Sequence, residues 1–145
     1  MYKFITQNSN YMTEMKKSKA LHTGLWIVQV LLAVAFGMSG FMKVSSTMEQ
    51  LAQSGMSFVN EYAESTVRFI GISELLGAIG LILPAALRIL PVLTPAAAVG
   101  IAIIMISATG YHISHNEPFF PALILFLLAA FVAWGRYSLA PVQPK

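Results

Sequence analysis

The chain has 145 residues, of which 57% are hydrophobic and only 10% charged, and its mean hydropathy is +0.70. A soluble domain carries about 25% charged residues, so this composition excludes an ordinary water-soluble domain and favours a single integral membrane domain in a lipid bilayer. The net charge of +3 comes from basic residues that are scattered or adjoin apolar runs, which argues against a nucleic-acid partner, and the absence of cysteine excludes disulfides, thiolate nucleophiles and cysteine-ligated clusters.

The predicted elements begin with a polar cytoplasmic tail, residues 1–20, which is either mobile or a weak interfacial helix. A membrane domain of residues 21–137 follows, with four spans at about 24–42, 67–83, 92–111 and 119–134. Each span approaches the about 20 residues that cross about 30 Å of hydrocarbon. Residues 138–145 form a cytoplasmic C-terminal tail. The sequence therefore predicts an all-α fold, an integral membrane four-helix bundle.

A cleaved signal peptide is the alternative interpretation of the first span. Lys16, Lys17 and Lys19 precede an apolar run that contains Ala33 and Ala35. The run continues to residue 42, however, and is longer than the about 7 to 15 residues of a signal-peptide core. An uncleaved span is therefore favoured.

The two longer connections differ in their predicted structure. Residues 44–66 are expected to hold a short amphipathic helix on the outer surface, since Ser46 and Glu49 fit a capping box and Gly55 fits a helix stop. Residues 84–91 are expected to form a tight inner turn, because Pro84 and Pro91 limit helix continuation.

The distribution of Lys and Arg predicts the orientation. Two basic residues, Lys43 and Arg68, lie on one side of the spans, beside several glutamates. Seven lie on the other side: Lys3, Lys16, Lys17, Lys19, Arg88, Arg136 and Lys145. The positive-inside rule therefore predicts a multi-pass protein of the cytoplasmic membrane with both termini in the cytoplasm.

Glu74 is the main candidate for a functional residue, because it lies inside the apolar second span. A charge at bilayer depth costs about 2.5 to 3.5 kcal/mol, so it is usually paired and functional. Gly71, Gly77 and Ala78 share its helix face, and small residues let membrane helices approach closely. Glu74 is thus expected to point into the bundle, where it either pairs with Lys43 or Arg68 or stays protonated.

Four other residues complete a predicted polar pocket in the outer half of the bundle: Lys43, Ser39, Arg68 and His112. The alternative is structural, with Glu74 holding helices together, Lys43 and Arg68 extending to the interface, and His112 simply interfacial. His112 and His115 are spaced i, i+3, but a third ligand is not evident, so no metal site is predicted. Haem with two axial histidines is disfavoured because His22 belongs to the opposite face.

Three sequence segments resemble the DoxX-like membrane proteins. They are Gly37-Met38-Ser39-Gly40-Phe41-Met42-Lys43 and the run from Gly71 through Glu74 to Pro84, followed by Leu93-Thr94-Pro95. The resemblance covers residues 25–137 and implies a four-helix membrane fold. It also implies association with thiosulfate:quinone oxidoreductase, with redox or oxidative-stress complexes, or, as in animal relatives, with chaperoning of receptor assembly.

Three functions remain open at this stage. The leading hypothesis is an accessory or quinone-interacting subunit of a membrane redox system, with Glu74 and His112 beside the quinone head. The second is a non-catalytic assembly factor or chaperone that holds a partner's helix, and the third is a small proton-coupled exporter. The dissimilar halves of the chain fit poorly with the repeat symmetry of transporters. A membrane-protein partner or a homo-oligomer is expected, and quinone is the candidate cofactor.

Overall fold

The structure is a computed structural model that describes the backbone of residues 1–145 and all side chains except those of residues 2–4, 6, 8–11, 13, 14 and 17. Five α-helices, one 3₁₀ turn and one π-helical turn make up the fold, without strands anywhere in the described backbone. In chain order they are α1 (Tyr2–Ser45), α2 (Met48–Gln53), η1 (Ser57–Asn60), α3 (Glu64–Leu87), α4 (Leu93–Ser114), α5 (Phe120–Trp134) and the π-helical η2 (Gly135–Leu139). The predicted all-α class is confirmed.

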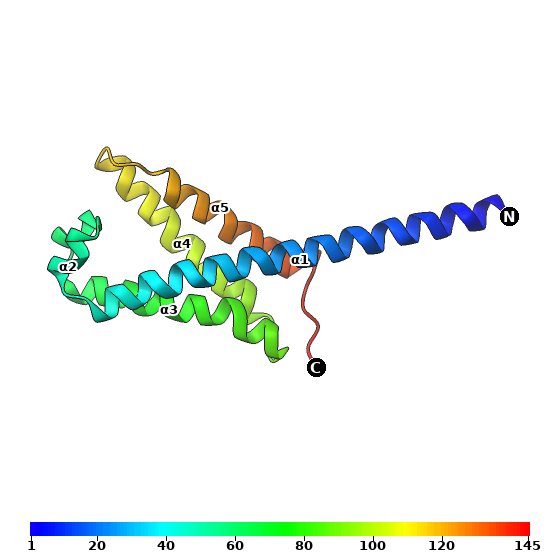
Figure 1. Ribbon diagram of the computed structural model, residues 1–145, viewed down its shortest axis with the longest axis horizontal. Helices are drawn as coiled ribbons and strands as arrows, with labels where there is room; N and C mark the ends of the chain where they lie inside the picture. The colour runs from blue at the N-terminus through cyan, green and yellow to red at the C-terminus, as the bar shows by residue number, and fades with distance from the viewer.

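Four helical segments are long and apolar enough to cross a membrane: Ser18–Ser45, Glu64–Leu87, Leu93–Ser114 and Phe120–Leu139. Helix α1 packs along α3, α4 packs along α5, and α3 also contacts α4, which closes the bundle (Figure 1). The predicted four-helix membrane bundle is therefore confirmed.

Helix α1 extends far beyond the bundle. Its 44 residues correspond to about 66 Å at about 1.5 Å per residue, roughly twice the hydrocarbon thickness of a bilayer. Its N-terminal part projects away from the other helices (blue in Figure 1). The predicted tail of residues 1–20 is thus helical from Tyr2 onward and continuous with the first span, while its cytoplasmic placement stays a prediction.

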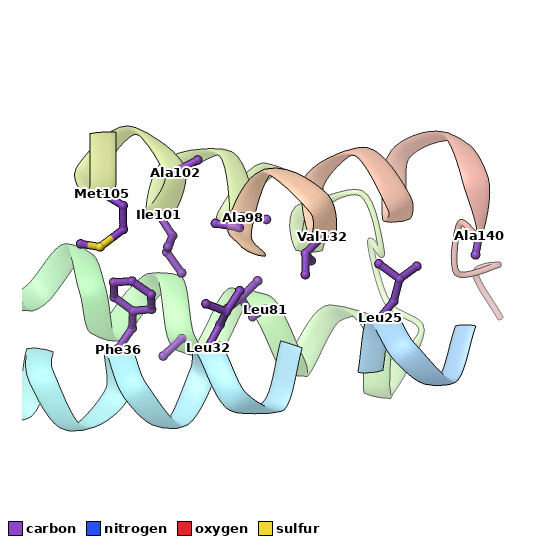
Figure 2. Close-up of a cluster of buried hydrophobic side chains, with 12 residues drawn as sticks. Leu25, Leu32, Phe36, Leu81, Ala98, Ile101, Ala102, Met105, Val132 and Ala140 are labelled. Atoms are coloured by element: carbon purple, nitrogen blue, oxygen red, sulfur yellow. The ribbon is translucent and has the colours of Figure 1, made fainter. Parts of the chain in front are cut away.

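The hydrophobic core lies between the α1–α3 pair and the α4–α5 pair (Figure 2). Leu32 and Phe36 reach from α1 toward Ile101 and Met105 of α4, and all four side chains are buried. Further contacts come from Leu25, Leu81, Ala98, Val132 and Ala140. Because these residues repeat at helical spacing on one face of each helix, the opposite faces are left for lipid.

The two ends of the bundle are named here by the residues that they carry. The α2 end holds residues 43–66 and 111–119, and the Arg88 end holds residues 18–26, 84–92 and 134–145. Each end contains a buried basic side chain, Lys43 at the α2 end and Arg136 at the Arg88 end.

The short helix in the long connection is present, but its predicted capping box was wrong by one residue. Thr47 is the N-cap and exchanges hydrogen bonds with Gln50, whereas the N–H of Ser46 bonds back to Met42 and ends α1. Leu51 of α2 is fully buried against Val59 and Val67. The predicted stop is confirmed, since Gly55 takes a positive φ of 93° and the N–H of Met56 reaches the Leu51 carbonyl, as in a Schellman motif.

The predicted inner turn is shorter than residues 84–91, because α3 continues through Pro84 to Leu87. A proline inside a membrane helix is tolerated where neighbouring groups bond to the disturbed carbonyls. Pro84 removes the N–H partner of the Gly80 carbonyl, and the Gln29 side chain of α1 donates to the next carbonyl oxygen, that of Leu81, at 2.6 Å. The helix ends instead at Arg88, which adopts a left-handed conformation with φ 59°.

Candidate functional site

A buried ion pair joins α1 to α3 near the α2 end. Lys43 Nζ lies 3.0 and 2.9 Å from the two carboxylate oxygens of Glu74, and the two residues are only 5% and 2% exposed. Lys43 Nζ also donates to the hydroxyl of Ser39, one turn earlier in α1. Each of the three ammonium protons therefore has an acceptor. Of the alternatives for Glu74, the structure has the pairing with Lys43.

Glycines allow the close helix crossing at this pair. A Cβ atom on Gly40 of α1 would lie 2.6 Å from the carbonyl oxygen of Gly71 in α3, and one on Gly71 would lie 2.7 Å from Lys43 Cβ. No side chain fits at these distances, so the two backbones touch directly. Gly77 meets α4 instead, where its Cβ would lie 2.9 Å from Ile101 Cγ1. The glycines near Glu74 thus bring α3 against two helices at once.

Phe58 of η1 covers the ion pair. The centre of its ring is 5.9 Å from Lys43 Nζ, within the range of a cation–π contact. The Phe58 ring makes edge-to-face contacts with the rings of Tyr62 and Tyr111, and the ring centres are 6.4 Å apart in each pair. The α2–η1 segment thus links the end of α1 to Tyr111 near the end of α4, and Figure 1 shows it at the same end of the bundle as the end of α4.

A set of polar contacts, the loop latch, fastens this segment to α4; it consists of Glu61, Tyr111 and His115. The Glu61 carboxylate accepts from the Tyr111 hydroxyl at 3.0 Å and lies 3.1 Å from His115 Nε2. His115 Nδ1 faces the Tyr111 carbonyl oxygen at 2.8 Å, and the two rings stack with centres 4.0 Å apart. Both groups beside the imidazole accept hydrogen bonds and so favour its protonated form. They raise the pKa of His115 above its usual value, and the hydrogen bond to the Tyr111 carbonyl contributes most.

His112 and Glu117 form a second polar contact at the same end. His112 Nδ1 is 2.8 Å from Glu117 Oε2, and both side chains are partly exposed. Hydrogen bonds from Ser57 and His112 hold the pKa of the Glu117 carboxyl below its usual value. Among the side chains that the structure describes, no group of three or more His, Asp or Glu side chains is arranged to hold a metal ion.

Arg68 supports the crossing from outside. Its Nη1 donates to the carbonyl oxygens of Lys43 and Ser46 at the end of α1, the latter at 2.7 Å, while Nη2 pairs with Glu64. A guanidinium is well suited to the free carbonyls and the negative dipole end of a helix. Arg68 therefore positions the backbone that carries Lys43 and makes no ion pair with Glu74.

The sequence profile of the DoxX-like family matches residues 27–134, which include the second and third spans, most of the first and fourth, and both partners of the ion pair. The chain belongs to the DoxX-like family. A search of curated proteins and a search of solved structures gave no match.

In this DoxX-like protein the predicted site residues fall into two groups. Ser39, Lys43 and Glu74 are in direct contact. Arg68 touches only the backbone of Lys43, and His112 bonds to Glu117 instead of reaching Glu74. A role for any of the five in ligand binding stays a prediction.

The second polar cluster of the DoxX-like bundle, at the Arg88 end, was not predicted. Arg136 in η2 is only 3% exposed; its Nε donates to Gln29 Oε1, and its Nη1 lies 3.2 Å from the Ala140 carbonyl oxygen. The same Nη1 lies 3.0 Å from His22 Nδ1, and the guanidinium is 5.2 Å from the centre of the Trp26 ring. Gln29, an uncharged polar residue in the middle of the first span, was the sequence signal for this cluster.

Proposed function

We propose that this protein is an accessory subunit of a membrane redox system that binds a quinone head group at the Lys43–Glu74 pair. The observation that carries the proposal is the buried, fully hydrogen-bonded ion pair beneath the aromatic ring of Phe58. Buried charges in membrane spans are expensive, and a purely structural helix crossing does not need one.

The pair offers groups for both redox forms of a quinone. The ammonium of Lys43 would donate to a quinone carbonyl oxygen, and the carboxylate of Glu74 would accept from a quinol hydroxyl. The rings of Phe58 and Tyr111 offer aromatic faces beside these polar groups. Exposed apolar side chains of the spans, such as Leu76 and Ile79, provide a lipid-facing surface for an isoprenoid tail.

Access to the pair would require movement of η1. Exposed hydrogen bonds and aromatic edges hold the segment to α4 and contribute about 0.5–1.5 kcal/mol each. Val59 of η1, buried with Leu51 and Val67, would have to leave its apolar contacts as well. The helix crossing at Gly40 and Gly71 is independent of them. Opening of the loop latch would thus uncover Lys43 and Glu74 and leave the bundle intact.

The test compares the quinone bound to wild type, Glu74→Gln and Glu49→Gln after gentle purification at matched expression. Lipids extracted from each protein are quantified by mass spectrometry. We expect wild type and Glu49→Gln to retain quinone, because Glu49 is an exposed residue of α2, and Glu74→Gln to lose most of it. Equal quinone contents in wild type and Glu74→Gln, with the variant folded and inserted, would refute the proposal.

A non-catalytic assembly factor is the second candidate, and the long projection of α1 favours it (Figure 1). A helix that continues well past the bundle offers a surface to another membrane subunit. This candidate predicts a partner protein that co-purifies equally well with wild type and with Glu74→Gln. The quinone candidate predicts that Glu74→Gln loses the ligand whether or not a partner remains bound.

We also infer a cytoplasmic-membrane location with the Arg88 end and both termini on the cytoplasmic side. The inference rests on the seven-to-two distribution of Lys and Arg. Because the chain has no cysteine, Gln53→Cys and Gln143→Cys each introduce a unique thiol. An impermeant thiol reagent added to intact cells should label Gln53→Cys only, and labelling of Gln143→Cys only would reverse the orientation.

A further inference from the structure

The buried Arg136 at the Arg88 end has a hydrogen-bond donor without an acceptor. Arg136 Nη2 is buried and has no hydrogen-bond partner among the described residues. The groups that its other nitrogens meet are neutral: Gln29 Oε1, the Ala140 carbonyl oxygen and His22 Nδ1. A buried guanidinium with no carboxylate partner is costly, because nothing nearby balances its charge.

His22 makes the excess of donors larger. Its Nδ1 lies 3.0 Å from Arg136 Nη1, and its Nε2 accepts from Trp26 Nε1 at 3.1 Å. Arginine and tryptophan nitrogens only donate, yet a neutral imidazole has one acceptor nitrogen and one N–H. Arg136 Nη1, Trp26 Nε1 and the imidazole's own N–H are thus three donors at a ring that has one acceptor lone pair. At least one N–H of this trio has no acceptor within the protein.

A cavity of about 470 Å³ lies next to these donors. His22 and Trp26 line one side of it, and Arg88 lines another together with residues 141–143 and Ala85 and Ala86. The described lining contains two ring N–H donors and a guanidinium but no carboxylate. The charge and the donors of this lining are suited to an anion with several acceptor oxygens.

The position of the cavity favours a membrane lipid as the source of that anion. It lies at the end of the spans, and its lining residue Arg88 stands in the α3–α4 turn among the exposed apolar residues Leu87, Ile89 and Leu90. Lys19, one helical turn before His22, adds an exposed cation on the same face of α1. Basic pockets between membrane helices are suited to anionic lipid head groups.

We propose that the cavity at the Arg88 end binds a phosphate-bearing anion, the head group of an anionic phospholipid. The phosphate oxygens accept from the Arg88 guanidinium and from the N–H of the His22–Trp26 pair that has no acceptor within the described part of the protein. The charge of Arg136, directly behind His22, is then balanced by the ligand. This site is separate from the proposed quinone site, because it lies at the opposite end of the bundle and uses none of the same residues.

The experiment uses the full chain in detergent on a Trp134→Phe background, which leaves Trp26 in the cavity wall as the single tryptophan. Trp26 emission is followed during titration with phosphatidylglycerol, zwitterionic phosphatidylcholine or soluble glycerol phosphate. We expect saturable binding of phosphatidylglycerol, and about tenfold weaker binding for Arg88→Gln, as for the loss of one charge-assisted hydrogen bond. Arg88 is exposed, so this variant should fold normally. Lys16→Gln removes one exposed positive charge outside the cavity and should leave the affinity unchanged.

Each outcome bears on the proposal. Saturation by glycerol phosphate at the same Arg88-dependent site supports the phosphate chemistry and assigns it to a soluble source. Equal responses to phosphatidylglycerol and phosphatidylcholine, with no response to glycerol phosphate, would overturn it. An affinity that falls equally in Arg88→Gln and Lys16→Gln would also overturn it, because general attraction between the basic surface and the lipid would then explain the binding.

Discussion

The two ends of the bundle each bury a basic side chain, but only one of them supplies its counter-charge. At the α2 end, Lys43 meets both oxygens of Glu74, and the imidazole of His115 lies between two acceptors. At the Arg88 end, Arg136 meets neutral groups, and the imidazole of His22 lies between two donors. At the α2 end the buried charge is paired, whereas at the Arg88 end Arg136 Nη2 and at least one further N–H have no acceptor among the described residues.

This contrast shows that burial alone does not indicate what a polar group does in a membrane protein. Lys43 and Arg136 are almost equally buried, at 5% and 3% exposure. The difference appears only when donors and acceptors are counted atom by atom. At the α2 end the loop residue Phe58 covers a cluster whose donors are all paired, whereas at the Arg88 end donors remain free to bind an added acceptor.

The largest expected effect concerns the charge balance of the two ends. Glu74→Leu leaves the Lys43 ammonium buried without its counter-charge and should lower the free energy of unfolding by about 3–5 kcal/mol. Adding Lys43→Met should restore most of that loss, because no charge then remains in the crossing. Arg136→Met should cost less, about 1–3 kcal/mol, since it leaves the Gln29 oxygen unpaired but no charge.

Unfolding titrations of the purified variants in detergent measure these differences. The comparison of the two ends fails if Arg136→Met is as costly as Glu74→Leu. It also fails if the double variant at the α2 end is no more stable than Glu74→Leu alone, because the two side chains would then not act as a pair.

A second, smaller effect should distinguish the two ends of α1. Gly40→Ala places a Cβ atom against the Gly71 backbone and should cost about 1–3 kcal/mol as the helices separate. Gly24→Ala meets nothing within 4 Å, and its better helix propensity should leave stability unchanged or raise it by up to about 1 kcal/mol. Thermal unfolding measures both, and equal losses in the two variants would show that α1 and α3 do not rely on the Gly40 contact.

Much of the α2 end could be predicted from sequence. Glu74 was recognised because a carboxylate in an apolar run is unusual, and its neighbouring glycines follow helical spacing, which fixes the side of α3 that faces inward. Lys43 was placed at a compatible depth, but the choice between Lys43 and Arg68 was not possible. That choice depends on the end of α1, whose free carbonyls bind the Arg68 side chain.

The Arg88 end could not be predicted because its cluster depends on tertiary geometry. Arg136 follows the fourth span, where basic residues usually extend to the membrane surface. In the structure Arg136 belongs to the π-helical turn of residues 135–139 and is buried. Helix α1 is close at this point, since a Cβ atom on Gly135 would lie 2.5 Å from the Leu25 side chain. Neither the extra backbone residue in the turn nor the approach of α1 is visible in hydropathy.

The smallest expected effect is a pH dependence of the loop latch at the α2 end. The pKa of His115 is raised above its usual value of 6.5, so its contribution is fully present below 6.5 and is lost as the pH rises through the raised value. The pKa of Glu117 is lowered from 4.5, so its contribution is present above 4.5 and is lost as the pH falls through the lowered value. Both contributions are present between these limits.

Amide hydrogen exchange in residues 57–62 should therefore show more protection at about pH 6 than at about pH 8.5, after correction for the intrinsic exchange rates. The change is expected to be small, since the groups are exposed and water screens their charges. His115→Gln removes the titrating ring and should abolish the difference in protection. The amides around Gln29, far from the latch, should show the same protection at both pH values. A pH difference that persists in His115→Gln would mean that another group titrates at this end, and the contrast between the imidazoles of His115 and His22 would then lose its physical basis.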